Sequence, residues 1–187
     1  MAKGKGGNGL MRAALKFLKK SDFQRNKRAA NHRLEPHQLK HMLQGSSGTT
    51  HFNGLRSGPG KYGTRTGYHY RPGGQDIPGR RILPPPNKTH PSGAYDVRTQ
   101  FEVDQSKGKD GSKMVWTDKK GPGGSSTFYP DHWTPQQIDG AVSGAFKNGT
   151  LDPAKGTWKG VGPDGLKIEG RYDPNSGGIV TAYPVID

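Results

Sequence analysis

The sequence predicts an α+β domain in which N-terminal helices precede a mostly antiparallel sheet with one packed helix. Three observations support this prediction. Apolar residues recur with helical spacing before residue 45, short strand-like segments follow residue 95, and one strong helix start lies at Thr134. Because only 28% of the 187 residues are hydrophobic, we expect one core rather than two.

Two helices are expected in the first part of the chain. Apolar residues interleaved with lysines predict a basic amphipathic helix over about 9–30. Pro36 suits the first turn of a second helix, and Gly45 is well placed to end it. His41 then lies in its last turn. The apolar positions of this helix share one face: Leu39, Met42 and Leu43.

The stretch 45–91 is expected to be an irregular, basic, surface-exposed loop region. Gly, Ser, Thr, Pro and Arg predominate, apolar periodicity is lacking, and the rigid run 84–86 consists of prolines. We divide the chain into a basic leader, 1–35, and a folded domain, 36–187. The leader is compatible with an RNA-binding arm, a membrane-facing amphipathic piece or a solvated linker.

Strands are expected from residue 95 onward. Polar and apolar residues alternate over 95–103, which indicates a half-buried strand, and 114–116 suggests its partner. Later strands are predicted over 157–161, 166–172 and 179–185, with a turn at 173–178 between the last two.

A helix should begin at Thr134. Thr134 and Gln137 have the spacing of a capping box, and Pro135 occupies the first helical position. We expect the helix to end near Gly149. Its buried face should contain Ile138, Ala141, Val142, Ala145 and Phe146.

The charge of the chain points to a polyanionic partner. The formal net charge is +14, from 29 basic and 15 acidic residues, so nucleic acid is the first expectation. The absence of cysteine excludes disulfides, thiolate metal sites and a cysteine nucleophile. No apolar run is long enough to predict a membrane-spanning helix, and we expect no stable membrane association.

Four motifs together resemble the bacterial EndoU nucleases. Each is weak alone, but they occur in the order found in that family and span 41–184. The resemblance implies a fold shared with other small toxin ribonucleases of the barnase-like kind. It also implies metal-independent cleavage of RNA, with tRNA a candidate, to a 2',3'-cyclic phosphate. The motifs are His41-Met42-Leu43-Gln44-Gly45, Gly67-Tyr68-His69-Tyr70, the segment 126–134 and the segment 177–184.

The resemblance also implies the site residues. His69 would be the general base and His41 the general acid, although the two roles could be exchanged. Thr181 and Tyr183 are two apart on a predicted strand, so both hydroxyls should face one cleft. Other expected substrate contacts are Ser126, Thr127, Tyr68, Lys113 and Lys167.

The chain departs from the family at one point. Many EndoU enzymes carry a catalytic lysine just before the segment matched here by 127–130, where this chain has Gly124-Ser125-Ser126-Thr127. We consider Lys113 and Lys167 as substitutes for this cation. Among the other histidines, His51 is the best reserve candidate for catalysis.

No metal or cofactor is expected. His37 and His41 have i, i+4 spacing but lack the intervening Glu of a zinc protease pair. The expected whole is the toxic part of a larger bacterial effector that acts in the cytoplasm of a target cell. An immunity protein, acidic enough to be attracted by the basic surface, is the expected partner. The alternative is a non-catalytic RNA-binding module with incidental histidines.

Overall fold

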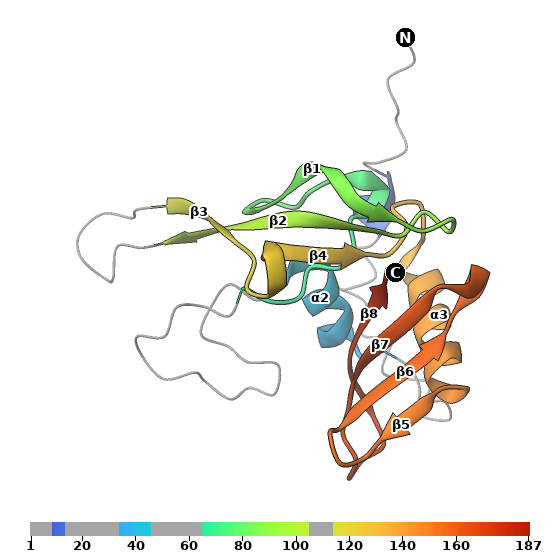
Figure 1. The fold of residues 1–187 in the computed structure, drawn as a ribbon. Coiled ribbons are helices and arrows are strands. Elements are labelled where there is room, and N and C mark those ends of the chain that lie inside the picture. Colours follow the sequence, from blue (N-terminus) through green and yellow to red (C-terminus); the bar gives the residue numbers. More distant parts are fainter. Residues whose placement is uncertain (1–8, 14–33, 46–64, 105–113) are drawn as a thin grey trace.

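The computed structural model describes residues 9–13, 34–45, 65–104 and 114–187. Within them the predicted α+β class is confirmed, but the strands form two antiparallel sheets instead of one (Figure 1). The first sheet contains β1 (Arg80–Thr89), β2 (Tyr95–Asp104), β3 (Met114–Asp118) and β4 (Ser125–Phe128). The second contains β5 (Thr150–Asp152), β6 (Thr157–Val161), β7 (Lys167–Tyr172) and β8 (Ile179–Val185). The helices are α2 (Pro36–Gln44) and α3 (Pro135–Lys147), with short 3-10 turns at Pro72–Gly74, Pro122–Gly124 and Pro163–Gly165.

The first sheet is built around β2. On one side β2 pairs with β1, and on the other it pairs with β3 along 100–104 and with β4 along 95–98. The strand predicted over 95–103 and its predicted partner at 114–116 are therefore confirmed. β4 continues the edge of β2 that β3 begins, and the chain turns between the two strands. That turn carries Lys119 and Lys120.

The expectation of irregular chain throughout 45–91 is wrong for its last part. β1 runs through Arg80–Thr89 and includes the three prolines, all exposed. Its pairing with β2 shifts register between Leu83 and Lys88. The prolines occupy this shifted stretch at the sheet edge, where no ladder N–H is required of them. The segment 46–64 lies outside the described residues.

α3 packs on one face of the second sheet. It begins with the predicted capping box, in which the Thr134 side chain accepts a hydrogen bond from the N–H of Gln137. Gly160 of β6 lies so close to the helix that an added Cβ would stand 2.1 Å from the carbonyl oxygen of Ala145. All five apolar residues predicted for the buried face of α3 are buried: Ile138, Ala141, Val142, Ala145 and Phe146.

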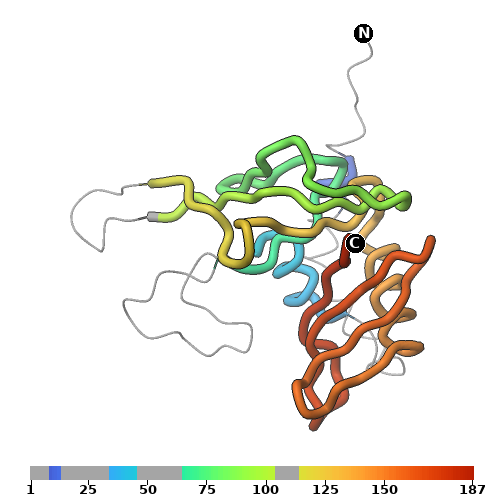
Figure 2. Tube along the Cα trace, viewed as in Figure 1, coloured from blue at the N-terminus to red at the C-terminus, as the bar shows by residue number. Residues whose placement is uncertain are grey.

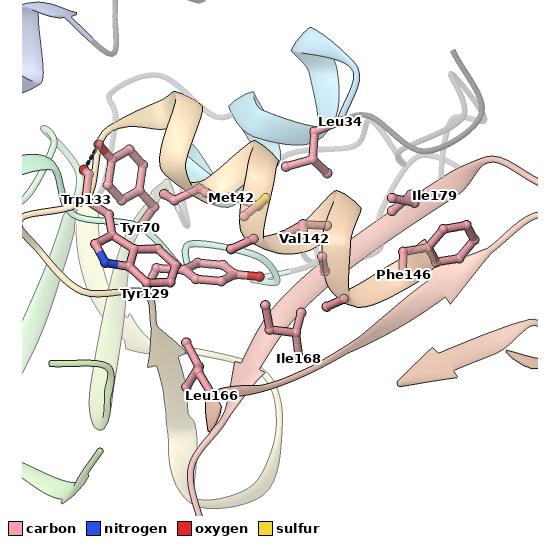
Figure 3. Close-up of a cluster of buried hydrophobic side chains, with 14 of the residues drawn as sticks. Leu34, Met42, Tyr70, Tyr129, Trp133, Val142, Phe146, Leu166, Ile168 and Ile179 are labelled. Atoms are coloured by element: carbon pink, nitrogen blue, oxygen red, sulfur yellow. Dashed lines mark hydrogen bonds between the residues drawn. The ribbon is translucent and has the colours of Figure 1, made fainter. Parts of the chain in front are cut away.

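The main core joins α2, α3 and the inner face of the second sheet (Figure 3). Leu34 and Met42 meet Val142 of α3 there, and Ile168 and Ile179 close the cluster from the sheet. The predicted helix at 36–44 is confirmed, and Gly45 ends it with an N–H bond to the carbonyl of His41. A second cluster lies against the first sheet and consists of Tyr68, Tyr95, Val97, Phe101 and Phe128.

The predicted helix over 9–30 is described only in part. Residues 9–13 are helical, and Met11 packs against the main core, whereas 14–33 lie outside the described residues.

Among the described residues, no helix has the length and apolar character needed to cross a membrane. In Figure 2, α2 lies beneath the first sheet and beside β8.

Candidate active site

The backbone brings the two predicted catalytic histidines together. The N–H of Tyr68 donates to the carbonyl of His41 (3.1 Å), and the N–H of His69 donates to the carbonyl of Met42 (2.6 Å). The last turn of α2 is thus bonded directly to the chain that carries His69. As a result, both histidine motifs form one substructure.

Gly67 sets how closely these segments approach. Its φ is +74°, and an added Cβ would lie 2.6 Å from Cε1 and 2.7 Å from Nε2 of His41. Any side chain at this position would strike the imidazole. The glycine that precedes the second histidine therefore allows the first histidine to occupy its place.

His69 is held by β4 through one ring nitrogen. Its Nδ1 lies 2.7 Å from the carbonyl oxygen of Thr127 and 3.2 Å from Oγ of Ser126. Because a carbonyl can only accept, Nδ1 carries the proton, and Nε2 of the neutral imidazole keeps its lone pair. The ring also stacks on Tyr183 of β8, with centroids 5.6 Å apart and planes inclined by 26°. Nε2 is therefore the atom of His69 suited to accept a proton.

Lys119 is the site residue that sequence analysis missed. It follows β3, is only 9% exposed, and its Nζ donates to Oγ of Ser126 (2.7 Å). Its charge lowers the pKa of both His41 and His69, so it lies near both imidazoles. The chain thus has a buried lysine in the site despite the Gly-Ser segment at 124–127. The available signal was the Lys119-Lys120 pair after a strand and before a glycine-rich turn.

Burial shifts all three of these titratable groups toward their neutral forms. Desolvation, with the charges of Lys119 and His37, lowers the pKa of His41 to about 4. Desolvation and Lys119 lower the pKa of His69 well below its usual range, although the bond to Thr127 opposes them. Desolvation lowers the pKa of Lys119 to about 7, against the attraction of Asp96. An anion bound among these groups would raise all three values, since negative charge favours their protonated forms.

Thr181 and Tyr183 share one face of β8, as expected from their spacing. Oγ1 of Thr181 accepts a bond from the N–H of Arg171 (3.1 Å), so this hydroxyl also holds the bulge between β7 and β8. Burial and the charge of Glu169 raise the pKa of the Tyr183 hydroxyl, so it is a hydrogen-bonding group rather than an anion. The ring of Tyr183 contacts a catalytic candidate directly, because it stacks on His69.

The other residues predicted to contact substrate differ in their exposure to solvent. The Tyr68 side chain is fully buried and its hydroxyl donates to Asp76 (2.5 Å), while its contact with RNA stays a prediction. Ser126 is 3% exposed, and its hydroxyl donates to the carbonyl of Tyr68; its expected contact with substrate stays a prediction. Lys167 is exposed on β7 and forms an ion pair with Asp187.

Three further predicted site residues are Lys113, His51 and Thr127. Lys113 and His51 lie outside the described residues. The carbonyl of Thr127 holds His69, while contact between its hydroxyl and RNA stays a prediction. Among the described residues, no three His, Asp or Glu side chains group in a way suited to a metal ion.

Paired imidazoles with a buried lysine and a stacked tyrosine define a site for acid–base chemistry on an anionic substrate. The sequence pattern of the bacterial EndoU nuclease family matches residues 37–186. The chain therefore belongs to this family of nucleases. A protein of Bacillus cereus named "Toxin" is 28% identical over 152 residues, which make up 81% of this chain and 23% of that protein. The chain thus spans about a quarter of that relative's length. No solved structure matches this chain.

Proposed function

We propose that this chain is a metal-independent endoribonuclease toxin domain that cleaves RNA, with tRNA its first candidate substrate. The ribose 2'-OH attacks the adjacent phosphorus, the bond to the 5'-oxygen breaks, and a 2',3'-cyclic phosphate and a 5'-hydroxyl remain. One observation carries this proposal: two imidazoles and a buried lysine converge, and the Nδ1 of His69 is anchored to a carbonyl, leaving Nε2 as a base.

The three side chains divide the reaction between them. Nε2 of His69 takes the proton of the 2'-OH, and protonated His41 supplies a proton to the departing 5'-oxygen. The ammonium of Lys119 stabilises the negative charge that develops on the phosphorane. His69 is assigned as the base because its ring is neutral and oriented in the free enzyme. His41 acquires its proton when the substrate phosphate raises its pKa.

Lys119 is well suited to stabilise the transition state because it is fixed before substrate arrives. Ser126 holds its Nζ inside the protein, so little reorganisation is needed during the reaction. Loss of one such preorganised charge is expected to lower kcat by about 10²–10³-fold.

The physiological setting is inferred from charge and from the named relative. A net charge of +14 favours binding to RNA and to an acidic immunity protein that covers the site. The similarity to a longer protein named "Toxin" supports a domain of a larger bacterial effector, delivered from the producing cell and active in the cytoplasm of its target.

The central test uses total tRNA in the presence of EDTA, with analysis of fragment ends. The wild type should produce 2',3'-cyclic phosphate ends, and His41→Ala, His69→Ala and Lys119→Met should each lose most activity. His132→Ala, which alters an exposed histidine, is the matched control and should cleave normally. Cleavage that stops on chelation, or that survives both active-site histidine substitutions, would overturn the mechanism.

The alternative is a non-catalytic RNA-binding module. It predicts salt-sensitive RNA binding without cleavage under any condition. Measuring binding and cleavage on the same tRNA preparation separates the two functions.

A further inference from the structure

The second sheet has a groove on the face opposite α3. The side chains at its floor and walls alternate with the residues that face the helix, and each of the four strands contributes. The groove has a volume of about 270 Å³. Its outward-facing strand residues are Thr150, Asp152, Thr157, Lys159, Glu169 and Tyr183.

The groove adjoins the candidate active site at Tyr183. One side of this ring stacks on His69, and the same residue lines the groove. Glu169 lies directly across from Tyr183 in the β7–β8 pairing, and its charge raises the pKa of the tyrosine. An RNA strand with its scissile phosphate at the imidazoles therefore reaches the groove across a single side chain.

The chemistry of the groove suits a nucleotide. Lys159 and Lys155 are exposed at its wall and can contact a phosphate, although Lys155 also pairs with Asp152 (3.2 Å). Glu169 is half-buried, and an ionised carboxylate only accepts hydrogen bonds. Guanine presents two adjacent N–H donors on one edge, whereas uracil presents two carbonyls and a single N–H. The groove thus combines a phosphate contact with a base contact that discriminates.

We propose that this groove is a second nucleotide subsite, which binds a nucleotide flanking the cut and prefers guanine through Glu169. The proposal rests on the proposed ribonuclease function. It differs from the catalytic contacts because it concerns a nucleotide beyond the reacting phosphate.

The test uses single-stranded oligoribonucleotides with one cleavable ribose and each of the four bases on either side of the cut. The wild type should cleave the guanine-flanked substrate about tenfold faster than the uracil-flanked one, as expected for a paired base contact. Glu169→Gln should bring these rates close together. Glu102→Gln, which changes a glutamate on β2 of the other sheet, should leave the preference unchanged.

A second variant tests the phosphate contact independently. Lys159→Gln should raise KM for the longer oligonucleotides severalfold and reduce the salt dependence of binding by about one counterion. It should leave cleavage of a dinucleotide unchanged, because the scissile phosphate is the only phosphate of a dinucleotide and Lys159 would contact the next one along the strand. Lys88→Gln, on β1, is the charge-matched control.

The outcomes separate this inference from the proposed function. If the wild type cleaves no RNA, the proposed function fails. If it cleaves all flanking sequences alike, or if Glu169→Gln retains the guanine preference, the subsite is overturned while the ribonuclease stands. Thermal unfolding of each variant confirms that the comparison is made between folded proteins.

Discussion

At the scale of single residues, Ser126 links the proposed cation to the proposed base. Its buried hydroxyl accepts from Nζ of Lys119 (2.7 Å), donates to the carbonyl of Tyr68 (2.7 Å) and lies 3.2 Å from Nδ1 of His69. A hydroxyl suits this position because it donates and accepts at once. Ser126 is therefore suited to position both proposed catalytic groups.

We predict that Ser126→Ala lowers kcat by about tenfold or more with little change in KM. The ammonium of Lys119 loses its buried acceptor, so its pKa falls further and the alkaline decline in activity moves to lower pH. The pH–rate profile measures this directly. Ser126→Thr keeps the hydroxyl and should retain most activity, whereas a profile of Ser126→Ala identical to that of the wild type would contradict the positioning role.

The pH dependence of cleavage should reflect Lys119. Raising the pH through about 7 deprotonates this lysine and removes the positive charge from the site, so kcat/KM should fall on the alkaline side. Lys119→Arg keeps its charge at every pH tested and should lose this decline, at a lower overall rate because the guanidinium is larger. Measuring kcat/KM for the wild type and Lys119→Arg from pH 4 to 9 at constant ionic strength tests this prediction. A wild-type rate that stays flat between pH 7 and 9 would show that Lys119 does not titrate in this range, contrary to the prediction.

At the scale of elements, the site depends on one close approach between α2 and the chain around Gly67. Three backbone bonds join Tyr68, His69 and Tyr70 to the last turn of the helix. At the point of closest approach this chain presents no side chain to His41, because Gly67 has none. The position of the first imidazole is thus determined by a neighbouring segment as well as by its own helix.

We predict that Gly67→Ala abolishes most activity, since its Cβ would displace the His41 ring. Gly165 provides a matched control: its φ is +73°, nearly the same as at Gly67, but nothing lies within 4 Å of an added Cβ. Both substitutions should destabilise the fold by about 1 kcal/mol through backbone strain. Gly67→Ala should cost more than Gly165→Ala, because its Cβ would also stand 2.6 Å from the carbonyl oxygen of His41. Denaturant unfolding and tRNA cleavage should show that only Gly67→Ala loses function; equal activity in the two variants would refute the argument.

At the scale of the whole molecule, the site lies where the two sheets meet. β4 of the first sheet contributes Ser126 and Thr127, and β8 of the second contributes Tyr183. The buried Arg71 strengthens the first-sheet side by bonding to Asp76 (2.6 Å) and Tyr95 (2.8 Å). Formation of the site therefore requires both halves of the described fold, and its buried histidines couple folding to pH.

Acid should weaken the fold through His41. Its pKa is about 4 in the folded protein and 6.5 in the unfolded chain, so the unfolded chain takes up a proton first as the pH falls. The associated stability is complete above pH 6.5 and is lost progressively toward pH 4, about 2 kcal/mol of it by pH 5. Urea unfolding at pH 8 and pH 5 should give a smaller difference for His41→Gln than for the wild type. An unchanged difference would show that His41 titrates normally.

Much of the secondary structure was determined by the sequence alone. The helices at 36–44 and 135–147 and the later strands follow from local periodicity, caps and turn residues, which act between neighbours along the chain. Resemblance to a family supplied His41 and His69 as candidates. Only the tertiary structure decided how distant segments contact one another. These contacts pair the proline-containing strand β1 with β2, divide the strands into two sheets, and bury Tyr68, Ser126 and, above all, Lys119. These depend on which segments pack together. The lysine pair after β3 is visible in the sequence, but only tertiary packing determines that Lys119 is buried near two imidazoles.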